Sequence, residues 1–205
     1  MAEVIYLQNV RLSFPHLVEP HASAPNAPAK YSADFIMDPA HAGFAEFRQR
    51  YAELAQGKWA EQAQQIMQMI QADRKLRCYC DGSERVNRKT LQVYEGYVGM
   101  VAIGASRDQK YQLIKADGNP VDSANTMEWQ QLARTLYAGC RVNVAIRPWL
   151  QDNQHGRAIR CDLVAIQFAS DDTPFGEGET DASGMFGAAQ QAVAPAAPTL
   201  PPYLQ

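Results

Sequence analysis

Alternation of apolar and polar positions is clearest between residues 141 and 168. The run RVNVAIRPWL (141–150) places Val142, Val144 and Ile146 on one side of a strand. The run GRAIRCDLVAIQF (156–168) follows after a polar turn, so the two runs together predict a β-hairpin. The other side of the first strand carries Arg147 and Trp149. The pattern therefore predicts a hairpin with one face in the core and one cationic, aromatic face.

Shorter apolar runs predict further strands and helices. Runs rich in β-branched and aromatic residues predict strands over residues 4–14, 30–37, 76–82, 96–106 and 110–115. Apolar residues at helical spacing predict a helix that begins at Asp38 (N-cap) and Pro39, ends before Gly57, and is followed by a second helix over 59–73. A short helix is expected over 127–136, capped by Thr126. This order predicts a mainly β chain with inserted helices (α+β), folded as a small, partly closed antiparallel β-barrel.

The charge of the chain divides at residue 170. Residues 1–170 contain 19 basic and 17 acidic side chains, whereas residues 171–205 contain five acids and no Lys or Arg. From Thr173 onward the sequence is rich in Gly, Ser, Ala and Pro, a composition that buries too little apolar surface to fold. We therefore expect a domain over 1–170 and a disordered tail over 171–205.

The start of the chain and its hydropathy favour a cytosolic protein. No charged and apolar segments of a signal peptide are evident at the N-terminus, and no apolar run approaches the ~18–20 residues that cross a bilayer. Four cysteines are too few for a disulfide scaffold, so reduced thiols are expected.

A metal site or a catalytic site finds little support in the sequence. Cys78 and Cys80 could meet on one side of a strand, but no second Cys or His pair at zinc-binding spacing accompanies them. None of the common nucleophile, phosphate-loop or metalloprotease motifs is present. The prediction is a protein without metal, cofactor or catalytic activity. A metal-dependent nuclease or hydrolase around these cysteines is the enzyme alternative.

Basic and aromatic residues give a stronger signal. Between residues 74 and 115 there are nine Lys or Arg and four acids, with four tyrosines among them, and the hairpin adds four arginines and Trp149. A basic groove follows a phosphate backbone, and exposed rings stack on unpaired bases of any sequence. The pattern indicates single-stranded DNA as partner, with RNA or weak duplex binding left open. The candidate contact residues are Arg77, Tyr79, Arg85, Arg88, Lys89, Tyr94, Tyr97, Lys110, Tyr111, Arg141, Arg147, Trp149, Arg157 and Arg160.

An ordered series of segments resembles a bacteriophage family. These segments are VRLSFPHL, KYSADFIM, LRCYCDGSER, GYVGMVAIGASRDQKYQLIKADGNPV, YAGCRVNVAIRPWLQDNQHGRAIRCDLVAIQF and DDTPFGEG. The family is that of small phage single-stranded DNA-binding proteins, formerly classed as a domain of unknown function. The resemblance covers roughly residues 4–178.

Membership would imply an OB-fold, no catalytic activity, and coating of displaced single strands during phage DNA replication or recombination in the host bacterial cytoplasm. The DNA face that it implies matches Arg77, Tyr79, Arg85, Tyr97, Tyr111, Arg147 and Trp149. A virion assembly protein, whose basic hairpin contacts a partner subunit, is the remaining alternative.

The acidic tail is expected to dock phage replication or recombination proteins, as acidic tails do in many single-strand binders. In those proteins an aromatic residue closes the tail, whereas here nineteen residues follow Phe186. The candidate docking residues are Asp171, Asp172, Phe175, Glu177, Glu179, Asp181 and Phe186.

Overall fold

The computed structural model describes residues 3–22 and 24–176 of the chain. Within them it contains seven strands, three α-helices and three single-turn 3-10 helices. The strands are β1 (Ile5–His21), β2 (Lys30–Met37), β3 (Tyr79–Asp81), β4 (Val101–Arg107), β5 (Gln112–Ile114), β6 (Arg141–Asn153) and β7 (Gly156–Ser170). The helices are α1 (Ala42–Trp59), α2 (Ala63–Ala72), α3 (Thr126–Ala133) and the 3-10 turns η1 (Ala60–Gln62), η2 (Arg74–Leu76) and η3 (Gly82–Glu84).

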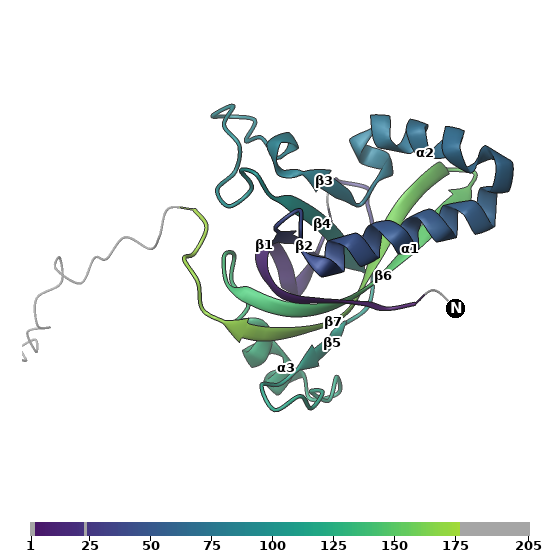
Figure 1. Ribbon diagram of the computed structural model, residues 1–205. Helices are drawn as coiled ribbons and strands as arrows, with labels where there is room; N and C mark the ends of the chain where they lie inside the picture. Colours follow the sequence, from purple (N-terminus) through teal and green to yellow (C-terminus); the bar gives the residue numbers. More distant parts are fainter. Residues whose placement is uncertain (1–2, 23, 177–205) are drawn as a thin grey trace, which may run out of the picture.

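Five of the strands close into a barrel in the order β1-β2-β4-β7-β6 and back to β1 (Figure 1). Four of the five contacts are antiparallel, and the fifth, between β4 and β7, is parallel through the register pair Ser106 and Asp162. This is the strand order of an OB-fold, with α1 and α2 inserted between the second and third barrel strands. The predicted OB-like, α+β barrel is therefore confirmed, although its closure makes the sheet mixed rather than wholly antiparallel.

Alternating residues of the long strands fill the barrel. Val142, Val144 and Ile146 of β6 are fully buried, as the hairpin pattern predicted. They pack in one cluster with Leu7 and Leu12 of β1 and with residues of β2, β4 and β7. The opposite side of β6 is half-buried or exposed, so it is available as a surface.

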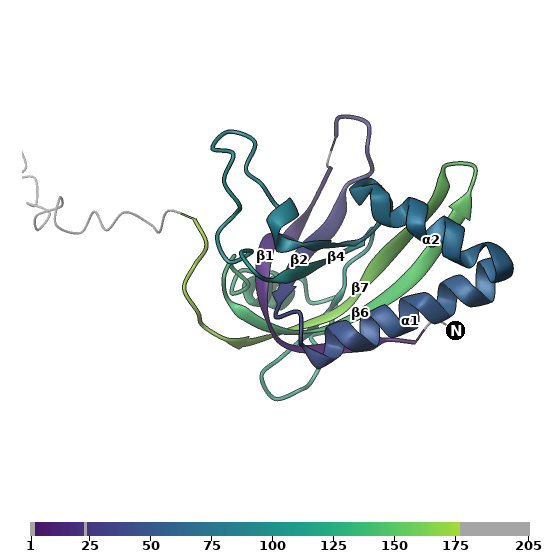
Figure 2. The ribbon, with the colours of Figure 1, turned by 45° about the horizontal axis from the view of Figure 1, so that its top comes forward.

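The two inserted helices support the hairpin where it extends beyond the barrel (Figure 2). Tyr51 and Trp59 of α1 and Ile66 and Ile70 of α2 form a second apolar cluster with Ile159 of β7. The indole Nε1 of Trp59 also donates a 2.7 Å hydrogen bond to Asp152 near the hairpin turn. One face of the hairpin is thus fixed by helices, which leaves the other face outward.

Several predicted element boundaries are corrected by local hydrogen bonding. Helix α1 begins after His41, whose Nδ1 accepts from the amide of Gly43, while Asp38 caps a preceding turn. The helix runs through Gly57 to Trp59. Asn125, not Thr126, caps α3.

Three predicted strands also differ in length. The strand predicted over 96–106 begins only at Val101, after turns in which Gly96 and Gly99 have positive φ. The strands predicted over 76–82 and 110–115 shorten to β3 and β5. Strand β1 continues past Pro15 to His21, because a shift of register between Ser13 and His16 accommodates the proline.

The residues after β7 remain attached to the barrel as far as Gly176. Asp172 accepts from Arg141 at 2.8 Å and lies 3.5 Å from Arg11, and the amide of Phe175 donates to the carbonyl of Ala138 at 2.9 Å. The packed body therefore extends beyond residue 170. Of the helices that the structure describes, none has the length and apolarity to cross a membrane.

Candidate nucleic-acid interface

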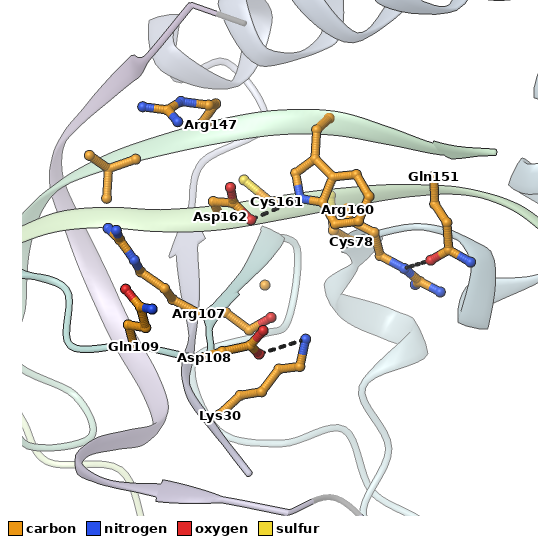
Figure 3. A pocket seen from close by; sticks show the side chains of 14 residues that line it. Lys30, Cys78, Arg107, Asp108, Gln109, Arg147, Gln151, Arg160, Cys161 and Asp162 are labelled. Atoms are coloured by element: carbon orange, nitrogen blue, oxygen red, sulfur yellow. Dashed lines mark hydrogen bonds and ion pairs between the residues drawn. The ribbon is translucent and has the colours of Figure 1, made fainter. Parts of the chain in front are cut away.

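A groove of about 570 Å³ lies on the outside of the barrel, where β4 meets β7 (Figure 3). It is bounded by the start of β2 on one side and by the outward face of the β6–β7 hairpin on the other. In an OB-fold, the face around the second and third strands, between the loop after the first strand and the last hairpin, is where oligonucleotides bind. The groove occupies that position.

Four cations and two acids surround the groove: Lys30, Arg107, Arg147, Arg160, Asp108 and Asp162. Lys30 pairs with Asp108 at 3.0 Å, and Arg160 donates to Gln151 and to the carbonyl of Lys75. Among the described residues, the guanidinium groups of Arg107 and Arg147 have no hydrogen-bond or ion-pair partner. The groove thus has an excess of positive charge, and two of its arginines are available to an anion.

Trp149 provides an aromatic surface at the edge of this groove. Its side chain is 38% exposed, and its Nε1 donates a 2.8 Å hydrogen bond to Asp162 on the neighbouring strand. The bond holds the indole in one orientation and leaves its apolar surface partly open. A ring fixed in this way can stack on a base with little loss of side-chain entropy.

A row of half-buried polar residues crosses the barrel from the groove to β1. Neighbouring strands pair these residues directly, in the order Arg147, Asp162, Ser106, Ser32 and His16. Their chain neighbours Cys161, Ala105, Ala33 and Leu17 are buried, so the row lies on the outer surface. We call it the polar row.

Comparison with known proteins assigns the chain to a family. Residues 3–194 match the model of the single-stranded DNA-binding protein of Enterobacter phage Enc34. The chain belongs to the Enc34 family of phage single-stranded DNA-binding proteins. Family membership confirms the predicted resemblance and the prediction of a DNA-binding protein rather than an enzyme.

Individual relatives agree with this assignment. A structure of the Enc34 protein in complex with single-stranded DNA superposes with a TM-score of 0.65 at 24% identity, covering 84% of this chain and 89% of that one. The single-stranded DNA-binding protein gp2.5 of bacteriophage T7 has the same fold at a TM-score of 0.50 and 9% identity, covering 95% of this chain and all of that one. A putative protein p50 of Acyrthosiphon pisum secondary endosymbiont phage 1 is 26% identical over 173 residues, covering 83% and 85% of the two chains.

Three of the predicted contact residues meet in the groove of this family member, and two groove cations were missed. These three are Arg147, Trp149 and Arg160, which all line the groove. Lys30 and Arg107 stand at strand ends far apart in the sequence, and only barrel closure brings them to the hairpin. Arg157 lies nearer the hairpin turn and pairs with Asp152 at 3.3 Å.

Two predicted stacking residues are corrected, because they belong to the core. Tyr97 is fully buried and donates to Asp34 at 3.0 Å, and Tyr111 is 1% exposed and donates to the carbonyl of Leu17 at 2.9 Å. Burial raises the pKa of both phenols. Neither ring has a face open to a base. Tyr79 is half-buried and packs under α1, with its hydroxyl 3.1 Å from that of Tyr51.

Several predicted cations are occupied by neighbouring groups. Arg77 pairs with Glu84 at 2.7 Å, and Arg85 pairs with Asp34. Lys110 donates weakly to Thr126 and lies 5.0 Å from the ring of Trp129. Arg141 is at the opposite end of β6 from Trp149, where Asp172 neutralises it. Arg88 and Lys89 are exposed on the loop over 85–96, where Tyr94 is half-buried.

The tail residues that the structure describes are attached to the barrel rather than free. Asp171 accepts from Tyr137, Asp172 pairs with two arginines, and the ring of Phe175 lies 4.1 Å from the guanidinium of Arg11. Gly96 leaves room for this ring, since an added Cβ there would lie 2.3 Å from it. Glu177, Glu179, Asp181 and Phe186 lie outside the described residues.

The cysteines resemble core residues more than ligands. Cys80, Cys140 and Cys161 are buried, and Cys78 is half-buried. Burial raises the pKa of Cys140 to about 11 and also raises the pKa values of Cys80 and Cys161, so these thiols stay protonated near pH 7. Over residues 3–22 and 24–176, no group of three or more His, Cys, Asp or Glu side chains is arranged to hold a metal ion.

Proposed function

We propose that this chain binds single-stranded DNA without sequence preference through the groove beside Trp149, and coats displaced strands during phage DNA replication or recombination in the host bacterial cytoplasm. The observation that carries the proposal is a fixed, partly exposed indole in an OB-fold groove, next to two arginines that have no side-chain partner among the residues the structure describes. Arg107 and Arg147 contact phosphates, and Trp149 stacks on a base. The complex of the Enc34 protein with single-stranded DNA supports the choice of polymer.

Single strands are favoured over a duplex for a physical reason. A ring can stack only on a base whose face is free, and duplex bases already stack on one another. The backbone contacts alone discriminate poorly between DNA and RNA, so RNA is a necessary arm of the test.

The test is fluorescence-anisotropy binding of a labelled dT oligomer, a matched duplex and a matched RNA at one salt concentration. The wild type should bind dT more tightly than the duplex. Trp149→Ala should weaken dT binding about 5- to 100-fold, the value of one lost stack, with the thermal midpoint unchanged. Met127→Ala on α3 is the control, because it removes another exposed apolar side chain away from the groove. A folded Trp149→Ala variant that binds dT like the wild type would contradict the proposal.

A further inference from the structure

Phe14 of β1 has an unusual backbone and an exposed ring. Its φ is +46°, a left-handed conformation that bulky residues rarely adopt, and it lies at the register shift between Ser13 and His16. Leu12 and Ser13 are both buried, so alternation breaks here and the Phe14 ring turns outward, 40% exposed. A single exposed apolar side chain is common on protein surfaces. A side chain that a strained backbone conformation turns outward is uncommon and suggests a function.

The ring is supported from beneath by other groups. Tyr94 meets it edge-on, with ring centroids 4.9 Å apart, and Tyr97 lies below at 6.2 Å. The guanidinium of Arg85 is 5.5 Å from the centre of the ring and is itself held by Asp34, which also accepts from Tyr97. Phe14 is thus fixed in place, as Trp149 is by Asp162.

Phe14 stands at the far end of the polar row. A shallow recess of about 240 Å³ beside it is lined by His16, Ser32 and Arg85, and it shares Gly104 and Ser106 with the groove. The two hollows therefore adjoin at Gly104 and Ser106 of β4. Gly104 leaves space where the hollows adjoin, since an added Cβ there would lie 2.9 Å from Asp34.

The length and charge of this passage suit a nucleic-acid strand. Four strand spacings of ~4.8 Å separate the ends of the polar row, a path of ~19 Å along the surface. That is room for several nucleotides, within the ~4–16 nucleotides that one OB-fold binds. Of the two acids on the way, Asp34 is neutralised by its ion pair with Arg85, and Asp162 accepts a hydrogen bond from the indole of Trp149 and lies opposite Arg147.

We infer that Phe14 is a second base-stacking platform, which receives a nucleotide several positions along the strand from the one stacked on Trp149. The inference rests on the proposed function. It assigns a role to the VRLSFPHL segment, whose phenylalanine no part of the groove explains. It also sets a minimum length of DNA for full affinity, because an oligomer too short to span the polar row can use only one platform.

The experiment compares dT oligomers of about 4 and about 12 nucleotides on wild type, Phe14→Ala and Trp149→Ala. Phe14→Ala should weaken binding of the longer oligomer about 5- to 100-fold and leave the short oligomer in the Trp149 groove unaffected. Trp149→Ala should weaken both. Phe14→Leu keeps apolar bulk but has no aromatic ring, so it should bind like Phe14→Ala. Phe14→Trp keeps a ring and should bind the longer oligomer like the wild type. Leu91→Ala, an 80% exposed apolar side chain on the adjacent loop, is the control.

The outcomes separate the two proposals. The inference is overturned if folded Phe14→Ala and Phe14→Leu bind long dT normally while Trp149→Ala weakens binding. The proposed groove beside Trp149 would then still stand. That result would mean that the Phe14 and Tyr94 surface serves another partner, such as a protein segment. Normal binding by Trp149→Ala overturns the proposed groove itself. If Phe14→Ala fails to fold, the affinities of Phe14→Leu and Phe14→Trp for long dT are compared. Equal affinities overturn the inference, and weaker binding by Phe14→Leu supports it.

Discussion

Arg147 is a groove arginine whose guanidinium is not engaged by the described residues. Its Nε is buried and, among the described residues, has no hydrogen-bond partner. Cross-strand pairing sets it opposite Asp162, whose Oδ1 accepts from the indole of Trp149 rather than from Arg147. A phosphate oxygen would satisfy this guanidinium and release a counterion.

Arg147→Ala is therefore expected to reduce both the affinity for dT and its salt dependence. Loss of one phosphate contact on a single strand should lower the slope of log affinity against log salt by ~0.7. Binding is measured across a salt series. Arg134→Ala, at the exposed C-cap of α3, should leave the slope unchanged. A wild-type slope near zero would remove the electrostatic basis of the proposed groove.

His16 gives a prediction about pH. Burial and the facing ring of His21, stacked at 4.3 Å, lower the pKa of His16 below its usual 6.5. The unfolded chain then binds more protons than the folded one as the pH falls through 6.5, so this site contributes stability above that pH and loses it below. The thermal midpoint should fall less for His16→Gln than for wild type between about pH 7 and about pH 5. Equal falls would show that His16 is not responsible.

The positions of single interface residues were predictable only where a local sequence pattern determined which way the side chain points. Strand alternation placed Arg147 and Trp149 on the outer face of β6, as the structure confirms. Tyr97 lies in a turn without such a pattern, whereas Tyr111 alternates with buried Leu113, a signal that the prediction did not use. Nothing local showed that both hydroxyls find buried acceptors. The strained φ of Phe14 has no sequence signal at all.

At the level of elements, the long β6–β7 hairpin was predictable from the sequence, but the packing of α1 and α2 against it was not. Period-two alternation over 141–150 predicted β6, and the run over 156–168 after the polar turn predicted β7. That α1 and α2 pack on the inner face of their extension depends on where the insertion between β2 and β3 folds back, which is a tertiary property. The same contacts explain why Trp149 projects from a rigid element rather than from a mobile turn.

Because its cysteines are buried in or next to strands, we expect the stability and DNA affinity of the protein not to depend on a metal ion. Cys80 lies in β3, Cys161 in β7 and Cys140 just before β6, and all three are buried among apolar side chains. A chelator should leave the thermal midpoint and dT affinity unchanged, and alkylation of these three thiols should be slow until the protein unfolds. The measurement is calorimetry with and without chelator, with metal analysis of the purified protein. Stoichiometric zinc whose removal unfolds the chain would revive the metal-site alternative.

At the scale of the whole molecule, the distribution of charge depends on which acids of the tail are paired with the barrel. The sequence suggested residue 171, but Asp172 is engaged by Arg11 and Arg141 and Phe175 is seated beside Gly96. These contacts belong to the stability of the barrel. Of the five tail acids, Glu177, Glu179 and Asp181 are the ones beyond them.

Two truncations should therefore behave differently. Ending the chain after Gly176 keeps every described contact, so the thermal midpoint should not change. Ending it after Ala169 also removes the partner of Arg11 and Arg141 and should lower the midpoint. A tethered acidic segment has an effective concentration of about millimolar at the groove, enough to compete weakly with phosphate. Its removal in the first truncation should strengthen dT binding, most at low salt where charges are least screened.

Weak duplex binding should also emerge in that truncation, because a cationic groove without an internal competitor accepts the phosphates of any helix. The measurement is dT and duplex binding by the full chain and by both truncations across a salt series. A full-length variant with Glu177, Glu179 and Asp181 changed to their amides is the matched control, since it removes charge without removing length. If the amide variant matches the truncation, charge competition is the cause. Identical low-salt curves for the full chain and the Gly176 truncation would leave the tail only a partner-docking or solubilising role.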